Sequence, residues 1–298
     1  MRKIKAPAFL AVALILIAGF AIRAWHVPQS HWGAISPMYV AEALRSLDSQ
    51  PHESKTLPVP FCLTVSDAGE ITRDPLCAPL SGHIAPAVAC GVQNIHKGAW
   101  QTRLLEQDPQ KLAQAVTPQL QGCSQIVIDF ESLAGTVERH RSWFTLLLGE
   151  FRRLRPEILL TLAVHAKTSA EGTWSGAAIQ DYTGLCQIAD ELLLMTYDYH
   201  YPGITPPGET APLVWVAQVL TYALSTCPKR KLRLGLAAYG YDWKTRAVIT
   251  ERGVGATGPT VFVESEQKRE EKRKLARSLG IRKTFLWALG MEKLRSDH

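Results

Sequence analysis

The sequence has no Cys-x-x-Cys pair, no low-complexity run and no glycine-rich turn after its first predicted strand. The first absence argues against a zinc ribbon or a thioredoxin-type site, although six cysteines are present. The second, together with 46% hydrophobic and 20% charged residues, argues against a disordered chain. The third disfavours a dinucleotide-binding fold. The 298 residues suffice for one large globular domain or two small ones.

The N-terminus carries an apolar run that follows basic residues. Arg2, Lys3 and Lys5 precede this run, which extends from Ala6 to Ile22 without a charge. The arrangement is typical of an export signal, and the run is short but within the range that spans a bilayer. No clear Ala-x-Ala cleavage site stands out. We therefore expect residues 1–24 to be a signal peptide or an N-terminal membrane anchor. The protein is then exported: secreted, periplasmic or anchored facing outside.

The cysteines do not reveal their own pairing. Export permits disulfides, yet six cysteines allow 15 connectivities and the sequence selects none. Several lie in apolar runs, which favours buried free thiols. The formal net charge of +6 suits an anionic wall polymer or a membrane surface, and equally a solvated basic helix. The six cysteines are Cys62, Cys77, Cys90, Cys123, Cys186 and Cys227.

After the N-terminal segment, short apolar runs alternate with stretches of helical periodicity. Strands that alternate with helices indicate parallel strands joined by crossover helices. Eight such units predict a single-domain α/β fold, a (β/α)8 TIM barrel over residues 30–298, with a doubly wound open sheet as the alternative. The first strand could be partly helical. The predicted strands are Trp32–Val40, Val59–Val65, Ile84–Val92, Gln125–Glu131, Ile158–His165, Leu192–Tyr197, Leu232–Tyr239 and Thr284–Leu289; the clearest helices are Val137–Leu154, Leu213–Leu224 and Glu266–Leu279.

An acid pair ends the fourth predicted strand. Side chains alternate along a strand, so Val127, Asp129 and Glu131 share one face and Ile126 and Ile128 share the other. In a parallel barrel the acids would then project into the mouth, where active sites lie. Two carboxylates this close do not both ionise freely, so the pKa of one of them should rise. That carboxyl group could then act as an acid near neutral pH. The alternative is an ordinary strand end with two solvated acids.

Aromatic and polar residues close three further predicted strands. Tyr197 and Asp198 follow one apolar run, Tyr239 ends another, and Trp287 lies at the end of the last. Aromatic faces suit the C–H surfaces of pyranose rings, and polar edges suit hydroxyls and amides. Each aromatic residue alone is more typical of a core, but their shared location at strand ends favours a sugar-binding site.

Five ordered motifs together resemble glycoside hydrolase family 18, the chitinase-like family. Within it they are most similar to the bacterial spore-germination and cortex-lytic branch of N-acetylglucosaminidases. The resemblance covers roughly residues 57 to 292, and any one motif alone would be a weak signal. The motifs are Ile128-Asp129-Phe130-Glu131, Met195-Thr196-Tyr197-Asp198-Tyr199-His200, Pro206-Pro207-Gly208 with Ala211-Pro212-Leu213-Val214-Trp215-Val216, Tyr239-Gly240-Tyr241-Asp242-Trp243 and Leu286-Trp287-Ala288-Leu289-Gly290.

The resemblance implies a role for each matching residue. Glu131 matches the general acid, Asp129 the carboxylate that orients the 2-acetamido group of the substrate, and Tyr197 the tyrosine that hydrogen-bonds this acetamide. The predicted substrate contacts are Asp198, Trp287 as the floor beneath the sugar, Tyr239, Asn94 and Met195. This family is an exception to the two-carboxylate rule, because the acetamide oxygen of the substrate replaces the nucleophile. The implied partner is a polymer that contains N-acetylglucosamine (GlcNAc). No cofactor, metal or nucleic acid is implied, and a monomer is expected.

The sequence also departs from the family pattern. The family has a polar residue where Val127 lies, and its usual Asp-Gly start is replaced by Ser124-Gln125. These changes keep open a catalytically weak or inactive glycan-binding barrel, and a membrane-anchored scaffold that binds protein is a third reading. The segment between Asp242 and Val261 is too short for the large insertion domain of many chitinases, so none is expected.

Overall fold

The computed structural model describes residues 31–50, 56–80, 89–253 and 260–293. The chain divides into two units, Met1–Ser30 and His31–His298, and only the second contains described residues. The predicted export segment, residues 1–24, therefore lies outside them. In the described ranges, no helix combines the length and the apolar character that crossing a bilayer requires.

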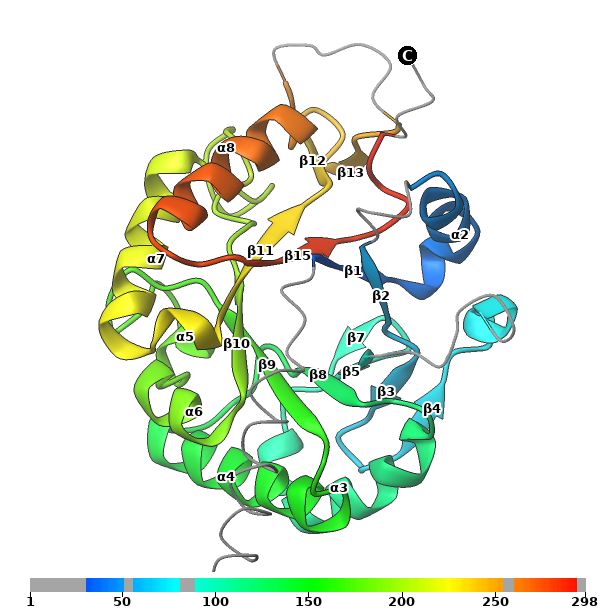
Figure 1. Cartoon of the computed structure of the whole chain (residues 1–298). Coiled ribbons are helices and arrows are strands. Elements are labelled where there is room, and N and C mark those ends of the chain that lie inside the picture. Colours follow the sequence, from blue (N-terminus) through cyan, green and yellow to red (C-terminus); the bar gives the residue numbers. More distant parts are fainter. Residues whose placement is uncertain (1–30, 51–55, 81–88, 254–259, 294–298) are drawn as a thin grey trace, which may run out of the picture. The chain divides into compact units, whose positions relative to one another are not determined.

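The second unit is a (β/α)8 TIM barrel, which confirms the predicted fold (Figure 1). One ten-stranded sheet contains the barrel strands, β2 and β3 being two pieces of the second one and β4 an antiparallel addition. β1 pairs in parallel with β15 and with β2, while β3 pairs in parallel with β5, so the ring closes through the broken second strand. The barrel strands are β1 (His31–Ile35), β2 (Leu57–Pro60) with β3 (Leu63–Val65), β5 (Ala89–Gln93), β8 (Gln125–Asp129), β9 (Leu159–His165), β10 (Glu191–Met195), β11 (Leu232–Ala237) and β15 (Lys283–Trp287).

Helices cover the outer face of the barrel, and apolar side chains fill both sides of the strands. Ile126 and Ile128 of β8 belong to the cluster between sheet and helices, together with Trp143 and Phe144 of α4. Val127, between them in sequence, belongs to the separate cluster inside the barrel. The predicted alternation of β8 is thus confirmed. The helices are α2 (Val40–Asp48), α3 (Pro109–Val116), α4 (Val137–Leu154), α5 (Ser175–Ala178), α6 (Tyr182–Ile188), α7 (Leu213–Thr226) and α8 (Glu266–Ser278).

The first predicted strand was too long. Strand pairing ends at Ile35, and a 3-10 helix, Pro37–Tyr39, leads into α2. Pro37 lacks the N–H that a continued ladder would need, and it suits the first turn of a helix. The partly helical alternative is therefore confirmed. Of the third predicted strand, β5 is described from Ala89 onward, and residues 84–88 lie outside the described ranges.

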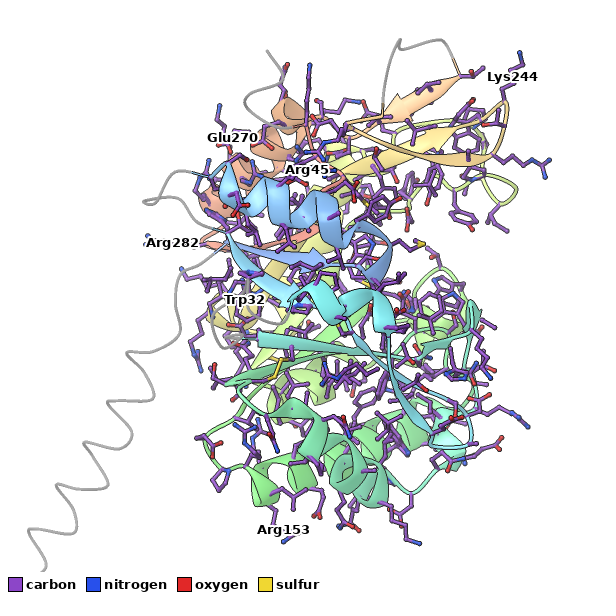
Figure 2. All side chains as sticks on the ribbon, turned by 90° about the vertical axis from the view of Figure 1, so that its right-hand side faces the viewer. Trp32, Arg45, Arg153, Lys244, Glu270 and Arg282 are labelled. Atoms are coloured by element: carbon purple, nitrogen blue, oxygen red, sulfur yellow. A yellow bond between two sulfur atoms is a disulfide. The ribbon has the colours of Figure 1, made fainter. Side chains whose placement is uncertain are left out.

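Small antiparallel sheets lie at the carboxyl ends of the barrel strands. β12 (Tyr239–Asp242), β13 (Ala247–Thr250) and β14 (Val261–Val263) form a three-stranded sheet between β11 and α8, and β6 (Ile95–His96) pairs with β7 (Ala99–Trp100). Figure 2 shows the β12–β13 hairpin extending beyond the barrel, with Lys244 at its tip. Within the described residues, this small sheet occupies the segment between β11 and α8, where no large insertion domain was expected. The remaining strand is β4 (Ile71–Arg73).

A buried ionic layer closes the amino-terminal end of the barrel. Glu191, the first residue of β10, accepts hydrogen bonds from Arg233 Nε at 2.9 Å and from Lys283 Nζ at 2.6 Å. Arg233 is fully buried, and its guanidinium lies 3.5 Å from the ring centroid of Trp32, which Figure 2 labels. A buried charge is tolerated when it is paired and hydrogen-bonded. This layer therefore lies beneath the apolar interior, at the amino-terminal ends of β10, β11 and β15.

All six cysteines are paired, which corrects the sequence-based preference for buried free thiols. The disulfides join Cys62 to Cys77, Cys90 to Cys123 and Cys186 to Cys227. All of these cysteines except the partly buried Cys90 are buried, and all pack in apolar clusters, so the apolar runs fit either state. Only the folded chain brings the partners to Cα separations of 6.0, 5.9 and 5.8 Å.

The double substitution Cys186→Ala/Cys227→Ala should lower the free energy of unfolding. This disulfide closes a loop of 41 residues, and a loop of that size is worth about 3–4 kcal/mol. Urea denaturation of the variant and of the wild type measures the difference. Alkylation of the wild type, unfolded without reductant, should modify no thiol; alkylated cysteines in that sample would contradict the pairing.

Candidate active site

Glu131 is fixed at the mouth of the barrel by its backbone. Asn94, which directly follows β5, donates its side-chain Nδ2 to the carbonyl oxygen of Glu131 at 2.7 Å and accepts from the Glu131 N–H at 2.8 Å. The same Nδ2 donates to the carbonyl oxygen of Gln101 at 3.0 Å, and Asn94 is fully buried. With both ends of its amide engaged, Asn94 positions Glu131 and is not placed for the sugar contact that the sequence predicted.

Of the two carboxyl groups of the pair, Asp129 is buried and Glu131 is partly buried, with 22% of its side chain exposed. Asp129 is 5% exposed and ends β8, and Glu131 follows two residues later. Burial raises the pKa of Glu131 well above its ordinary value, and the negative charges of Asp129 and Asp198 raise it further. Burial also raises the pKa of Asp129 to about 7. The coupled pair therefore holds a proton near neutral pH, as the sequence predicted. Within the described residues, Oδ1 of Asp129 is buried without a hydrogen-bond partner.

Asp198 lies beside two tyrosine hydroxyls at the end of β10. Its carboxylate accepts a hydrogen bond from Tyr239 at 2.8 Å, from Tyr241 at 2.7 Å and from Thr210 at 3.3 Å. The outer edge of the residue is exposed, yet protein atoms surround the carboxylate on its other sides. This enclosure raises its pKa, although the three hydroxyl groups favour the ionised form. The predicted residues Asp198 and Tyr239 are thus in direct contact, and Tyr241 is an addition that the sequence reasoning missed.

Tyr197 lies among all three carboxyl groups. Burial raises its pKa above the ordinary value, and the charges of Asp129, Glu131 and Asp198 add to the effect. Its ring packs on β11 at Gly235, where the Cβ of any other residue would come within 3.1 Å of the tyrosine Cε1. The missing side chain of Gly235 therefore leaves room for the edge of the tyrosine ring.

Trp287 and Met195 belong to the barrel interior beneath this group. Met195 is 6% exposed and lies in the interior cluster, so it supports the site from below. Trp287 ends β15, is half-buried, and packs edge-on against Phe61 with ring centroids 5.1 Å apart. A tryptophan held from below and open on its other side suits the predicted floor for a sugar.

His165 was missed by the sequence reasoning. It ends β9, and its Nδ1 lies 3.6 Å from Oε2 of Glu131. Burial lowers the pKa of His165 to about 4, so the imidazole is neutral near pH 7 and the contact is not an ion pair. The signal that could have found it is its position at a predicted strand end, the same criterion that singled out the other site residues.

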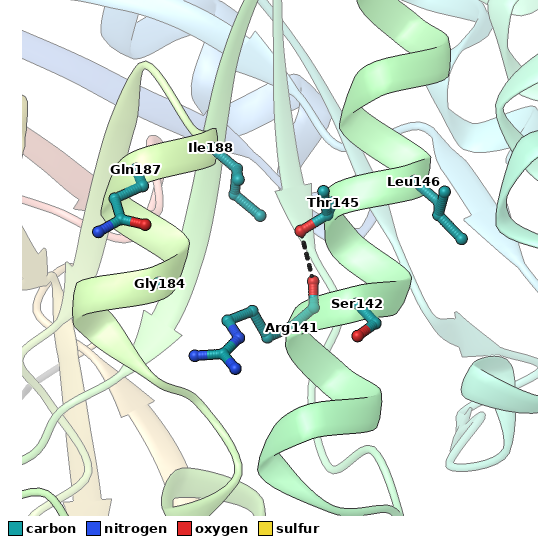
Figure 3. Close-up of a pocket in the computed structure, with 7 residues that line it drawn as sticks. All are labelled: Arg141, Ser142, Thr145, Leu146, Gly184, Gln187 and Ile188. Carbon is teal, nitrogen blue, oxygen red and sulfur yellow. Dashed lines mark hydrogen bonds between the residues drawn. The ribbon is translucent and has the colours of Figure 1, made fainter.

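The outer helical layer carries a shallow pocket of a different kind. It lies between α4 and α6, and no strand-end residue lines it (Figure 3). Arg141 at its edge pairs with Asp181 at 3.2 Å. In the described ranges, no group of three or more His, Cys, Asp or Glu side chains is arranged to hold a metal ion. The lining residues are Arg141, Ser142, Thr145, Leu146, Gly184, Gln187 and Ile188.

An acid pair beside a tyrosine at the carboxyl ends of barrel strands defines a protein of the glycoside hydrolase type. Residues 110–284, more than half of the 298-residue chain, match the glycosyl hydrolases family 18. The matched segment contains Asp129, Glu131, Tyr197 and Asp198. The chain therefore belongs to glycosyl hydrolases family 18, and the family predicted from the motifs is confirmed.

Similar proteins include cortex-lytic enzymes and chitinases. The chain is 36% identical over 126 residues to the cortical fragment-lytic enzyme of Bacillus subtilis (strain 168), an alignment that covers 41% of this chain and 28% of that enzyme. The chain thus matches less than a third of the length of this relative.

Two solved structures share the barrel. The Bacillus cereus spore cortex-lytic enzyme SleL superposes with a TM-score of 0.71 at 19% identity, over 88% of this chain and 71% of that chain. The chitinase from Chromobacterium violaceum ATCC 12472 gives 0.68 at 23% identity, over 89% and 95%. At these identities the likeness concerns the fold.

Replacing Glu131 with Gln should stabilise the folded protein at alkaline pH. A carboxyl with a raised pKa in the folded state favours folding while it is protonated, and this advantage is lost as pH rises through the folded-state value. Each pH unit between the folded and unfolded pKa values is worth about 1.4 kcal/mol. The Tm of the variant should therefore exceed that of the wild type by several °C at pH 8 and by less at pH 5, which calorimetry measures.

The matched control is Glu70→Gln, which alters an exposed carboxylate. Its Tm should follow the wild type at both pH values. An equal Tm of Glu131→Gln and wild type at pH 8 would contradict the raised pKa.

Proposed function

We propose that this chain hydrolyses β-glycosidic bonds in polymers that contain N-acetylglucosamine, with retention of configuration at the anomeric carbon. The observation that carries the proposal is the Asp129–Glu131 pair at the carboxyl end of β8, beside Tyr197, where burial raises the pKa of both carboxyl groups. A proton held near neutral pH is what a general acid needs. Membership of glycosyl hydrolases family 18 supports the same chemistry.

The proposed mechanism uses the acetamide of the substrate. Protonated Glu131 donates its proton to the glycosidic oxygen while the acetamide oxygen attacks C1, which releases the leaving sugar and forms an oxazolinium ion. Ionised Asp129 stabilises the positive charge that develops on the acetamide nitrogen, and Tyr197 orients the group by a hydrogen bond. Glu131, now ionised, then takes a proton from water as this water attacks C1. Both the enzyme and the acetamide are restored, and no second carboxylate has to act as a nucleophile.

The neutral imidazole of His165 suits this cycle. A cation 3.6 Å from Glu131 would favour the ionised carboxylate and lower its pKa. Because burial keeps His165 uncharged near neutral pH, Glu131 retains the proton that the first step consumes.

The substrate class follows from the acetamide and from the similar proteins. We propose peptidoglycan or a chitin-like glycan, since the relatives include a cortical fragment-lytic enzyme and a chitinase. Incubation with peptidoglycan and with chitin oligomers in parallel, followed by mass spectrometry of the products, distinguishes the two and also separates internal from terminal cleavage.

Export is part of the proposal. Three disulfides form in oxidising compartments, outside the cytosol of most bacteria, and the basic and apolar N-terminus is typical of an export signal. We propose a secreted, periplasmic or membrane-anchored protein that faces outside and acts as a monomer. Fractionation of the producing cells tests the location.

One observation favours a second candidate function, a glycan-binding barrel without turnover. Val127 is fully buried in the interior cluster, two residues before Asp129, so the inward position beside the acid offers no polar partner. The intact pair of Asp129 and Glu131 argues for catalysis. Glycan affinity without measurable turnover of the wild type would support the binding function.

Glu131→Gln should reduce turnover of the cleaved glycan by at least about a hundredfold, since general acid catalysis contributes about 10²–10⁴. Binding should persist, because Gln has nearly the same shape and the Asn94 contacts involve only the backbone of residue 131. Reducing-end release measures turnover, and Glu70→Gln is the control. Unchanged turnover in Glu131→Gln would rule out the proposed enzyme.

The pH profile of kcat/KM should be bell-shaped with a neutral optimum. Activity falls on the acid side as Asp129 gains a proton, and on the alkaline side as Glu131 loses its proton. In Asp129→Asn the alkaline limb should move to lower pH, because a negative charge that raises the pKa of Glu131 is gone. A wild-type rate that rises steadily to strongly alkaline pH would contradict these assignments.

A further inference from the structure

The loop between β9 and α5 presents an exposed tryptophan next to the acid pair. Trp174 is 44% exposed, and its ring lies edge-on to His165 with centroids 4.6 Å apart. His165 in turn lies 3.6 Å from the Glu131 carboxyl group. A single side chain therefore separates the indole from the proposed general acid, on a loop at the carboxyl ends of the strands.

The base of this loop is fixed by buried polar contacts. Lys167 is 2% exposed and donates to the carbonyl oxygen of Gln180 at 2.9 Å. The side-chain oxygen of Gln180 accepts the His165 N–H at 2.7 Å, and the Tyr182 hydroxyl donates to the His165 carbonyl oxygen at 2.5 Å. These contacts join the start of the loop and the segment after α5 to the end of β9, so Trp174 lies between two anchored points.

One side of the Trp174 ring is supported and another is open. A Cβ at Gly176 would come within 2.1–2.9 Å of three indole carbons, so the ring lies directly against this glycine. Only a residue without a side chain leaves room for the indole in this place. An exposed indole held in one orientation is a surface on which the C–H face of a pyranose can stack.

We propose that Trp174 is a sugar-binding platform, which stacks on a unit of the glycan chain beside the bond that Glu131 protonates. The inference rests on the proposed function, because the ligand is the same glycan. It adds a binding position outside the Asp129, Tyr197 and Asp198 group. Longer glycans should then bind more tightly than short ones that do not reach the indole.

Trp174→Ala should raise the KM for the cleaved glycan about tenfold, with a smaller effect on kcat. A tenfold change corresponds to about 1.4 kcal/mol of binding, within the range expected for an aromatic contact. The probes are chitin hexasaccharide and purified peptidoglycan glycan strands. Trp174→Phe keeps an aromatic face and should recover most of the affinity. Leu146→Ala, an exposed apolar residue on α4, should match the wild type.

Calorimetric binding in the Glu131→Gln background separates the two proposals. If neither probe binds to Glu131→Gln, both the proposed function and the platform are overturned. If a probe binds and Trp174→Ala leaves its Kd unchanged, the platform alone is overturned. Should Trp174→Ala fail to fold, Gly176→Ala displaces the indole without removing it and should raise the Kd as well. If the role of Trp174 is purely structural, Trp174→Ala should lower Tm while KM and Kd stay at the wild-type values. Trp174→Phe would then have no loss of affinity to recover.

Discussion

Two carboxyl groups that repel each other at the end of one strand are the constraint on which the proposed chemistry of this barrel depends. Neither Asp129 nor Glu131 has a cationic partner among the described residues that would hold it ionised, and His165, the base in contact with Glu131, is neutral. The pair therefore retains one proton where two isolated carboxyl groups would retain none. Asn94 maintains this arrangement from below, because it holds the backbone of Glu131 through both ends of its amide. The proposed acid function depends on these two features together.

The neighbouring carboxylate of Asp198 has different surroundings from that of Asp129. Two tyrosine hydroxyls and a threonine hydroxyl supply its carboxylate with donors, whereas Oδ1 of Asp129 has none within the described residues. Asp198 is thus part of a hydrogen-bond network between the segment after β10 and β12. Asp129 retains an oxygen for a group that arrives with the substrate. Asp198 and Asp129 are both aspartates, yet their different surroundings suit them to different roles.

Period-two alternation and strand-end position placed the acid pair, Tyr197 and Trp287 at the carboxyl ends of predicted strands, and the structure has them there. Strand-end position also singles out His165, but its 3.6 Å approach to Glu131 follows only from the folded barrel. The hydrogen bonds of Asn94 to the backbone of Glu131 follow from no residue pattern. α3 begins with Asp108 capping the N–H groups of Gln110 and Lys111, a signal that was present and overlooked. The disulfide pairing required the folded chain, since up to 41 residues separate the partners.

The ionic layer of Arg233, Glu191 and Lys283 bears on how reactants reach and leave Glu131. Among the described residues, these charged groups lie at one end of the barrel, and packed apolar side chains lie between them and the acid pair. Asp129 ends β8, so the acid pair lies at the opposite end. Under the proposed mechanism, the leaving sugar and the attacking water then arrive and depart on the same side of the molecule.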